Sequence, residues 1–345
     1  MQEQYDTIKR ARALLAATPK STARKSTVDD YRGKIKRLAN RMEVTRTFDA
    51  VINEALKTRK KSSWQAYRAA LLFTARNGLE TYLAEQDTLQ RGMKAAEALG
   101  QQTDWSPWLS MITKVEDSRR ALQTVLDASL PIEGRLDRHS KRQDMKGLPS
   151  DWREQIVARM PTYSMAALTA AVTGCRPAEL VSGVKLSIAD GMLTAYILGA
   201  KVDVEKGKGQ EWRKLSWSVD HPSGLVQEIL RQVRFTSGER IVQIANASNF
   251  SKSMSNAGKR LWPKRKATIT PYCMRHQVAA DMKADGGLSS TEISAALGHV
   301  SDVTKSTYGH ANMGRGGGVA PTKVSAARTV KMKTPSKAAS KKVKL

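Results

Sequence analysis

Apolar residues recur at helical spacing in two stretches within the first quarter of the chain. In each stretch they form one stripe, with lysines and arginines beside it or at its ends, which is typical of an amphipathic helix with a basic face. Ser26 and Thr27 can cap the first helix, and Ser62 or Ser63 can start the second. The apolar stripes are Val28, Tyr31, Ile35 and Leu38 in the first stretch and Trp64, Tyr67, Leu71 and Ala75 in the second.

The helical pattern continues over 77–128 with little charge bias, so this part is expected to extend the same domain. Beyond it, 129–149 contains Pro, Gly and polar residues without a sustained hydrophobic period, which is typical of an interdomain linker. The sequence therefore predicts a helical domain over 20–128, preceded by an N-terminal segment over 1–19 and followed by a linker over 129–149.

A second domain is expected over 150–311, where helical and strand patterns are mixed. The segments VKLSI, MLTAYILGAK and EWRKLSWSV are rich in strand formers and are separated by turn residues, which predicts a small three-stranded antiparallel sheet. Helices are expected at 223–234, 251–262, 271–285, 290–297 and 303–310. The predicted fold class is mainly α with a small antiparallel β-sheet.

The charge of the chain indicates a polyanionic partner. Of 345 residues, 58 are Lys or Arg and 32 are Asp or Glu, which gives a net charge of +26 and disfavours an acidic small-molecule enzyme. The two cysteines, Cys175 and Cys273, are too few for a disulfide framework, and neither has the neighbours that a zinc site needs. With no signal peptide and no long apolar run, we expect a cytoplasmic, nucleoid-associated protein, or a nuclear one in a eukaryotic host.

The positive charge is concentrated in two segments. Residues 20–76 hold fifteen Lys and Arg against five Asp and Glu, and 312–345 hold nine against none. We expect the first segment to contact DNA phosphates, the alternative being an ordinary solvated helical face. The candidate DNA-binding residues are Lys34, Arg37, Arg41, Lys60, Lys61, Arg68 and Arg76.

The second basic segment, 312–345, has almost no apolar periodicity and is expected to be a disordered tail. Such a tail can lie along phosphates and release counterions, although a purely solubilising terminus is an equally good interpretation.

Several polar residues of the second domain stand in otherwise apolar or turn surroundings. Taken singly, each is explained by a structural role, because such residues more often make surface ion pairs or pack in a core. Cys175 and Cys273 are interpreted as buried structural thiols rather than reactive ones. The polar candidates are Arg176, Lys201, Arg275, His276, His299, Tyr308 and His310.

The order and local context of these residues change their interpretation. TGCRPAEL is followed by a hairpin lysine in ILGAK, then by PYCMRHQVAADM and LGHVSDVTKSTYGH, in which His299 and Tyr308 lie nine residues apart. This series resembles the catalytic motifs of the tyrosine site-specific recombinases, also called the phage integrase family. The resemblance covers 150–311, while 20–128 resembles the core-binding domain of that family in position and charge.

The resemblance implies a reaction and a role for each motif residue. Tyr308 would attack the scissile phosphate and form a 3′-phosphotyrosyl intermediate, and Arg176 and Arg275 would clamp the phosphate. Lys201 would protonate the leaving 5′-oxygen, with Lys206 and Lys208 as rivals in the same turn. His299 would contact the same phosphate, and Glu179 would orient a neighbouring basic group.

The resemblance also implies how the enzyme works as a whole. Two domains would clamp duplex DNA, and a homotetramer with possible accessory proteins would recombine specific sites for integration, excision or resolution of a mobile element. No cofactor, metal ion or ATP is expected, because two guanidinium groups can balance the transition-state charge and the covalent intermediate keeps the bond energy.

The chain departs from the family pattern at Tyr272, where a histidine is usual. A tyrosine hydroxyl can donate a hydrogen bond to a phosphate oxygen but, with an ordinary pKa near 10, it cannot replace an imidazole as acid or base at neutral pH. The alternatives are therefore a telomere resolvase, a type IB topoisomerase-like enzyme, or a DNA-binding accessory protein with weakened catalysis. The usual apolar exchange helix after His310 is expected to be missing or reduced.

Overall fold

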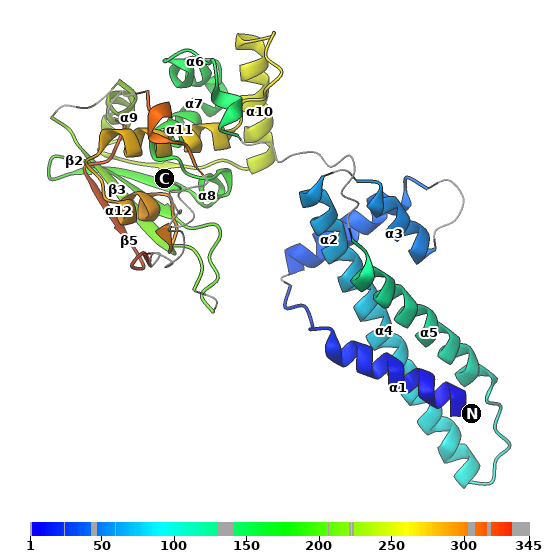
Figure 1. The fold of residues 1–345 in the computed structure, drawn as a ribbon. Helices are drawn as coiled ribbons and strands as arrows, with labels where there is room; N and C mark the ends of the chain where they lie inside the picture. Colours follow the sequence, from blue (N-terminus) through cyan, green and yellow to red (C-terminus); the bar gives the residue numbers. More distant parts are fainter. Residues whose placement is uncertain are drawn as a thin grey trace, which may run out of the picture. The chain divides into compact units, whose positions relative to one another are not determined.

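A computed structural model describes residues 2–23, 25–42, 47–58, 60–129, 141–205, 207–220, 222, 224–302, 308–315 and 319–332. The chain divides into two compact units, Met1–Arg138 and His139–Leu345 (Figure 1).

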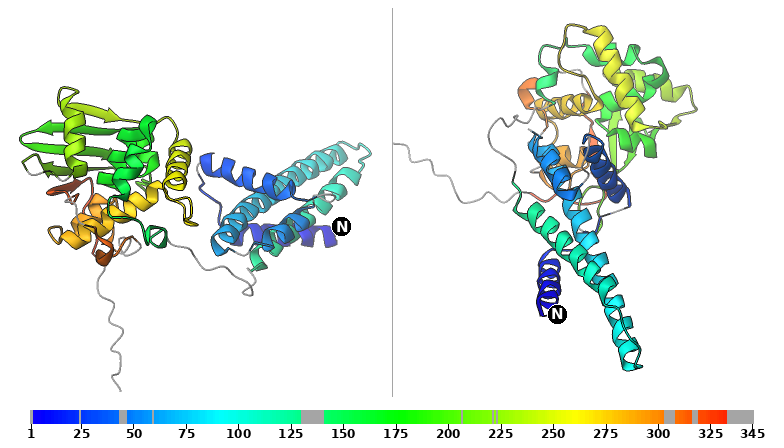
Figure 2. Two further views of the ribbon diagram at one scale, coloured as in Figure 1. Left: turned by 90° about the horizontal axis from the view of Figure 1, so that it is seen from above. Right: turned by 90° about the vertical axis from the view of Figure 1, so that its right-hand side faces the viewer.

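The first unit is built from helices alone in its described residues. They are α1 (Gln2–Ala17), α2 (Lys25–Ala39), α3 (Phe48–Leu56), α4 (Lys61–Ala98) and α5 (Ser106–Asp127). The long helices α4 and α5 lie side by side, and α1 packs against both (Figure 2). The two predicted amphipathic helices form as α2 and the first half of α4, because Leu38, Trp64 and Leu71 share one apolar cluster.

The first segment, for which we predicted no element, forms α1. Ile8 and Ala11 lie three residues apart on one helical face and are buried in a cluster with Leu79 and Trp108. This segment is therefore part of the helical unit.

The second unit contains one sheet surrounded by short helices. Its helices are η1 (Gln143–Met145), α6 (Trp152–Ala158), η2 (Pro161–Tyr163), α7 (Ser164–Thr173), α8 (Pro177–Ser182), α9 (Gly224–Arg234), α10 (Ala247–Leu261), α11 (Pro271–Asp285), α12 (Ser290–Ala296) and η4 (Ala311–Met313). Its strands are β1 (Val184–Ala189), β2 (Met192–Leu198), β3 (Trp212–Ser218), β4 (Glu239–Val242) and β5 (Lys323–Ala326). The expected fold class, mainly α with a small antiparallel sheet, is confirmed.

The sheet has five antiparallel strands in the order β4-β1-β2-β3-β5. Side chains alternate along each strand, so Leu186, Ala195 and Leu215 point to one buried face, against which α7, α8 and α9 pack. Helix α11 lies against α7 and is buried almost all round, since every residue from Cys273 to Met282 is buried. Its position in the core brings Arg275 to the middle of the unit.

The prediction of a three-stranded sheet is wrong, because two further strands join its edges. β4 pairs with β1, and β5 pairs with β3, with Val324 opposite Leu215. β5 lies inside the segment 312–345, which we predicted to be disordered, and that prediction is wrong for 319–332. Backbone hydrogen bonds hold β5 at the sheet edge, and the buried Val319 accepts a bond from Trp217 Nε1 at 3.0 Å. Residues 333–345 lie outside the described residues.

The end of the predicted linker is also part of the second unit. Arg265 donates to the carbonyl oxygens of Asp144 and Lys146 at 2.6 and 2.9 Å, and Met145 is buried. Residues 130–140 lie outside the described part. Of the predicted helices, 303–310 falls largely on undescribed residues 303–307, and Tyr308, Gly309 and His310 precede η4 in irregular backbone.

Candidate active site

Arg176 is placed by the end of one helix and the start of the next. Helix α7 ends at Gly174, whose φ of +63° suits glycine, and Pro177 opens α8. The Arg176 guanidinium donates from Nη1 to Glu179 Oε1 at 2.6 Å, and its backbone N–H donates to Glu179 Oε2 at 2.7 Å. The side chain is thus fixed against α8, and only 8% of the residue is exposed.

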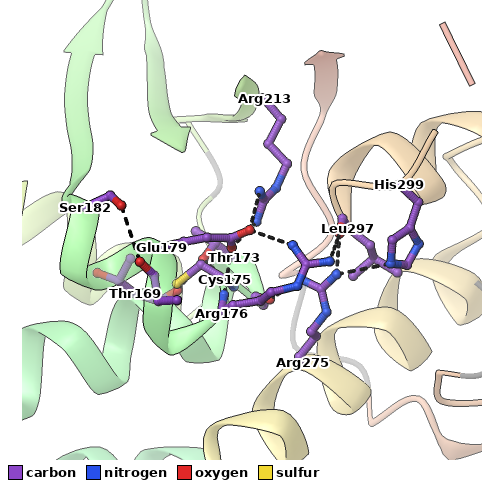
Figure 3. Close-up of polar contacts among 12 residues, drawn as sticks. Thr169, Thr173, Cys175, Arg176, Glu179, Ser182, Arg213, Arg275, Leu297 and His299 are labelled. Atoms are coloured by element: carbon purple, nitrogen blue, oxygen red, sulfur yellow. Dashed lines mark hydrogen bonds and ion pairs between the residues drawn. The ribbon is translucent and has the colours of Figure 1, made fainter. Parts of the chain in front are cut away.

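Arg275 is fully buried in α11 and reaches two backbone carbonyl groups. Its Nη1 donates to Gly174 O at 2.8 Å, and its Nη2 donates to Leu297 O. Arg176 Nη2 lies 3.5 Å from the same Leu297 oxygen, so both guanidinium groups meet at the end of α12 (Figure 3). Burial and the charge of Arg176 lower the pKa of Arg275 to about 10, which leaves it charged at neutral pH.

His299 follows a tight turn after α12. Gly298 has a φ of +70°, and His299 Nε2 lies 3.4 Å from Arg275 Nη2. Burial, followed by the charges of Arg275, Arg176 and Arg213, lowers the pKa of His299 to about 3. The imidazole is therefore neutral at physiological pH. With Nε2 facing a donor, its proton belongs on Nδ1, which is buried and has no partner among the described residues.

Tyr308 completes this group of side chains. The Arg275 guanidinium carbon lies 4.9 Å from the Tyr308 ring centroid, and the His299 ring stacks on it at 5.4 Å and 28°. Burial raises the pKa of Tyr308, but the positive charges of Arg275, Arg176 and Lys201 outweigh burial and lower it. The surroundings thus make the phenolate, which is the nucleophilic form, easier to reach than in an ordinary tyrosine.

The sequence reasoning missed Arg213. This residue lies on β3 with no exposed surface and donates to both carboxylate oxygens of Glu179, at 3.1 and 2.8 Å. Burial raises the pKa of Glu179, but the charges of Arg213, Arg176 and Arg275 lower it to about 2, so the carboxylate stays ionised. A signal was present in EWRKLSW, because strand alternation puts Arg213 on the same buried face as Leu215.

Lys201 lies in the hairpin between β2 and β3 and is exposed. The hairpin is narrow at this point, since a Cβ on Gly209 would lie 2.1 Å from the carbonyl oxygen of Lys201. Of its rivals, Lys208 forms a backbone β-bridge with Asp203 across the hairpin, and Lys206 lies outside the described residues. The charge of Lys201 contributes to the lowered pKa of Tyr308.

Other candidates lie at the edge of the group or outside it. Tyr272 is 39% exposed in the first turn of α11, and within the described chain its hydroxyl makes no hydrogen bond. His276 packs on Tyr308 with ring centroids 5.0 Å apart, and burial and the charge of Arg142 lower its pKa to about 4. His310 contacts Arg142.

The two cysteines are buried thiols. Burial raises the pKa of Cys175 to about 11 and also raises that of Cys273. Neither is a thiolate at neutral pH.

The candidate DNA-binding residues of the helical unit divide into two groups. Arg68 donates to Leu126 O at 3.0 Å, Arg76 donates to Thr18 O and Glu80, and Lys34 pairs with Asp30, so these three contact their own unit. The other four side chains are exposed on α2 and at the start of α4: Arg37, Arg41, Lys60 and Lys61.

Metal-binding clusters and membrane-spanning helices are both missing from the described residues. No cluster of three or more His, Cys, Asp or Glu side chains among them has the geometry to hold a metal ion. No described helix has the length and apolarity needed to cross a membrane.

No model of a known protein family matches the sequence, and no curated protein matches it. Among solved structures, the chain is similar to the XerH site-specific recombinase bound to a palindromic difH substrate in a post-cleavage complex. The two chains are 12% identical, with a TM-score of 0.35, over 88% of this chain and 90% of the other. The similar protein is of the class that the motifs resemble, but a likeness of this degree establishes no function.

Proposed function

We propose that this chain is a site-specific DNA recombinase that cleaves and rejoins duplex DNA through Tyr308. The observation that carries the proposal is the convergence of Arg176, Arg275, His299 and Tyr308, which come from four separate segments of the sequence. The convergence of charged side chains with a histidine and a tyrosine whose pKa values are shifted is typical of functional sites.

The charges of the site suit a phosphodiester in its transition state. Arg176 and Arg275 provide fixed positive charge where a pentavalent phosphorane gains negative charge.

The chemical step follows from these positions. The Tyr308 hydroxyl releases its proton to water, its oxygen attacks the phosphorus, and the bond between phosphorus and the 5′-oxygen of the next nucleotide breaks with its electron pair. Lys201, carried on the exposed hairpin, gives a proton to that oxygen. Attack by a free 5′-hydroxyl on the phosphotyrosine reverses the step and restores the phosphodiester.

The experiment is covalent trapping on nicked duplex DNA whose sequence is randomised on both sides of the nick. We expect the protein to form an SDS-stable adduct with a subset of duplexes, which sequencing of the trapped DNA then identifies. Tyr308→Phe should form none, because it lacks the attacking oxygen. Failure of the wild type to form an adduct, or an undiminished adduct with Tyr308→Phe, contradicts the proposal.

The outcome on intact DNA separates strand exchange from the related reactions. Strand exchange between two copies of the selected site, in a synaptic tetramer, supports recombination. Relaxed supercoils without exchange favour a topoisomerase-like enzyme, and hairpin ends on a palindromic site favour a telomere resolvase.

A further inference from the structure

We propose that Arg213 is a positioning residue of this site, which acts through Glu179 to hold Arg176 in place for the scissile phosphate. The inference rests on the proposed function, since it assigns Arg176 to the phosphate. Arg213 itself lies on β3 with no exposed surface, and both of its terminal nitrogens donate to Glu179, so it contacts the site through that carboxylate.

The contacts of Glu179 link the two arginines. Its two oxygens accept four N–H bonds: two from the Arg213 guanidinium, one from Arg176 Nη1 and one from the Arg176 backbone (Figure 3). Four bonds fill the acceptor positions of one carboxylate, so its orientation is fixed. By contrast, Nη2 of the same guanidinium has, among the described residues, only a 3.5 Å contact with Leu297 O. The position of the guanidinium therefore depends on the carboxylate.

Gly298 shows how closely the loop of His299 packs on this pair. A Cβ at this position would lie 3.1 Å from Arg213 Nη1 and 3.4 Å from Arg176 Nη1. Arg213 thus supports both the phosphate-binding arginine and the turn that presents His299.

The charge of Arg213 matters as much as its shape. Glu179 would neutralise Arg176 if it had no other cation, and the site would lose positive charge where the phosphate binds. Arg213 balances Glu179, so Arg176 and Arg275 remain as two uncompensated charges for the substrate. A planar guanidinium is needed because only it binds both carboxylate oxygens at once.

The test compares two scissile groups on a nicked duplex selected by the wild type: an ordinary phosphate and a neutral methylphosphonate. Arg213→Met should slow adduct formation on the phosphate roughly 100-fold, the cost of misplacing a catalytic group by about 1 Å. On the methylphosphonate, normalised to the wild-type rate on that group, the defect should shrink to less than about tenfold, because an uncharged group depends less on the charge of Arg176. The rate of adduct formation by Arg213→Lys should lie between the rates of the wild type and Arg213→Met.

Two controls separate positioning from general destabilisation. Arg153→Met breaks another buried ion pair, with Asp281 at 2.8 Å, and any defect it causes should be equal on both scissile groups. If Arg213→Met does not fold, the double variant Arg213→Met with Glu179→Gln takes its place, because it also removes the Glu179 carboxylate that has lost its partner. This double variant should fold, remain slow on the phosphate and be relieved on the methylphosphonate.

The inference is overturned if Arg213→Met cleaves the phosphate at the wild-type rate, if its defect is the same on both groups, or if the double variant recovers the wild-type rate. A wild-type protein that forms no adduct at all would instead contradict the proposed function.

Discussion

At the scale of single residues, the site holds its ionisable groups in fixed states. Glu179 is ionised and His299 is neutral at pH 7, because their pKa values are lowered to about 2 and about 3. Neither group titrates in the range where the enzyme would work. The protonation pattern of the site is therefore set by the fold.

These shifts make the stability of the second unit depend on pH. The unfolded chain protonates His299 near pH 6.5, while the folded chain does so near pH 3, so the unfolded state binds more protons between these values. The free energy of unfolding therefore has its full value above pH 6.5, where His299 is neutral in both states, and decreases as the pH falls toward 3. The lowered pKa of Glu179 also reduces the free energy of unfolding as the pH falls, but in the range below its ordinary pKa of 4.5.

We predict that His299→Gln flattens this dependence. Between pH 4 and 6, the slope of unfolding free energy against pH should decrease by up to about 1.4 kcal/mol per pH unit, the value for one proton. Urea unfolding at a series of pH values measures it. An unchanged slope would mean that His299 is protonated in the folded protein.

At the scale of elements, the buried Gln210 joins three segments around the site. Its Nε2 donates to His299 O at 2.9 Å and to Arg328 O at 2.8 Å, and its Oε1 accepts from Arg328 N at 2.8 Å. Gln210 follows the hairpin of Lys201, and Arg328 follows β5. The strand from the C-terminal segment therefore helps to hold the turn of His299.

We predict that Gln210→Ala destabilises the second unit by about 2–4 kcal/mol, since it removes three hydrogen bonds at roughly 1 kcal/mol each and leaves buried groups unpaired. Adduct formation should slow as well. The matched control is Gln243→Ala on the exposed surface, which removes one bond to Val181 O and should change stability by less than about 0.5 kcal/mol. Equal effects of the two substitutions, measured by urea unfolding, would show that Gln210 holds nothing in place.

The elements that the sequence predicted and those it did not differ in their physical signal. α2 and α9 present one apolar face to a core, so their spacing identifies them. Arg176 directly precedes α8 and Arg275 lies inside α11, so local helix signals place both. β5 is held by backbone pairing with β3, about a hundred residues earlier in the chain, and such pairing leaves little trace in side-chain pattern. The contacts of Arg213 are likewise long-range. The alternation of side chains along β3 predicts that Arg213 is buried, but it does not predict that Glu179 is its partner.

At the scale of the whole molecule, the net charge of +26 is unevenly shared. Arg37, Arg41, Lys60 and Lys61 are exposed on the helical unit, whereas Arg153 and Arg213 of the second unit are buried and paired with Asp281 and Glu179. The surface charge available to an anionic partner is therefore smaller than the composition alone implies. Residues 333–345 add five lysines and no acidic residue.

The C-terminal segment has two parts with different expected roles, and two truncations separate them. Ending the chain after Met332 keeps β5 and removes only the last five lysines. DNA binding should weaken, and the slope of log affinity against log salt should become shallower by up to about 4, because each phosphate that the protein no longer neutralises changes it by about 0.9. Adduct formation at saturating protein should stay near wild type.

Ending the chain after Arg315 also removes β5, Val319 and Arg328. This truncation should slow adduct formation even at saturating protein, because the turn of His299 loses its support through Gln210. Fluorescence anisotropy at several salt concentrations and covalent trapping measure the two effects. If the shorter truncation alone abolished cleavage at saturating protein, or if the longer one left cleavage intact, this division of the segment would be wrong.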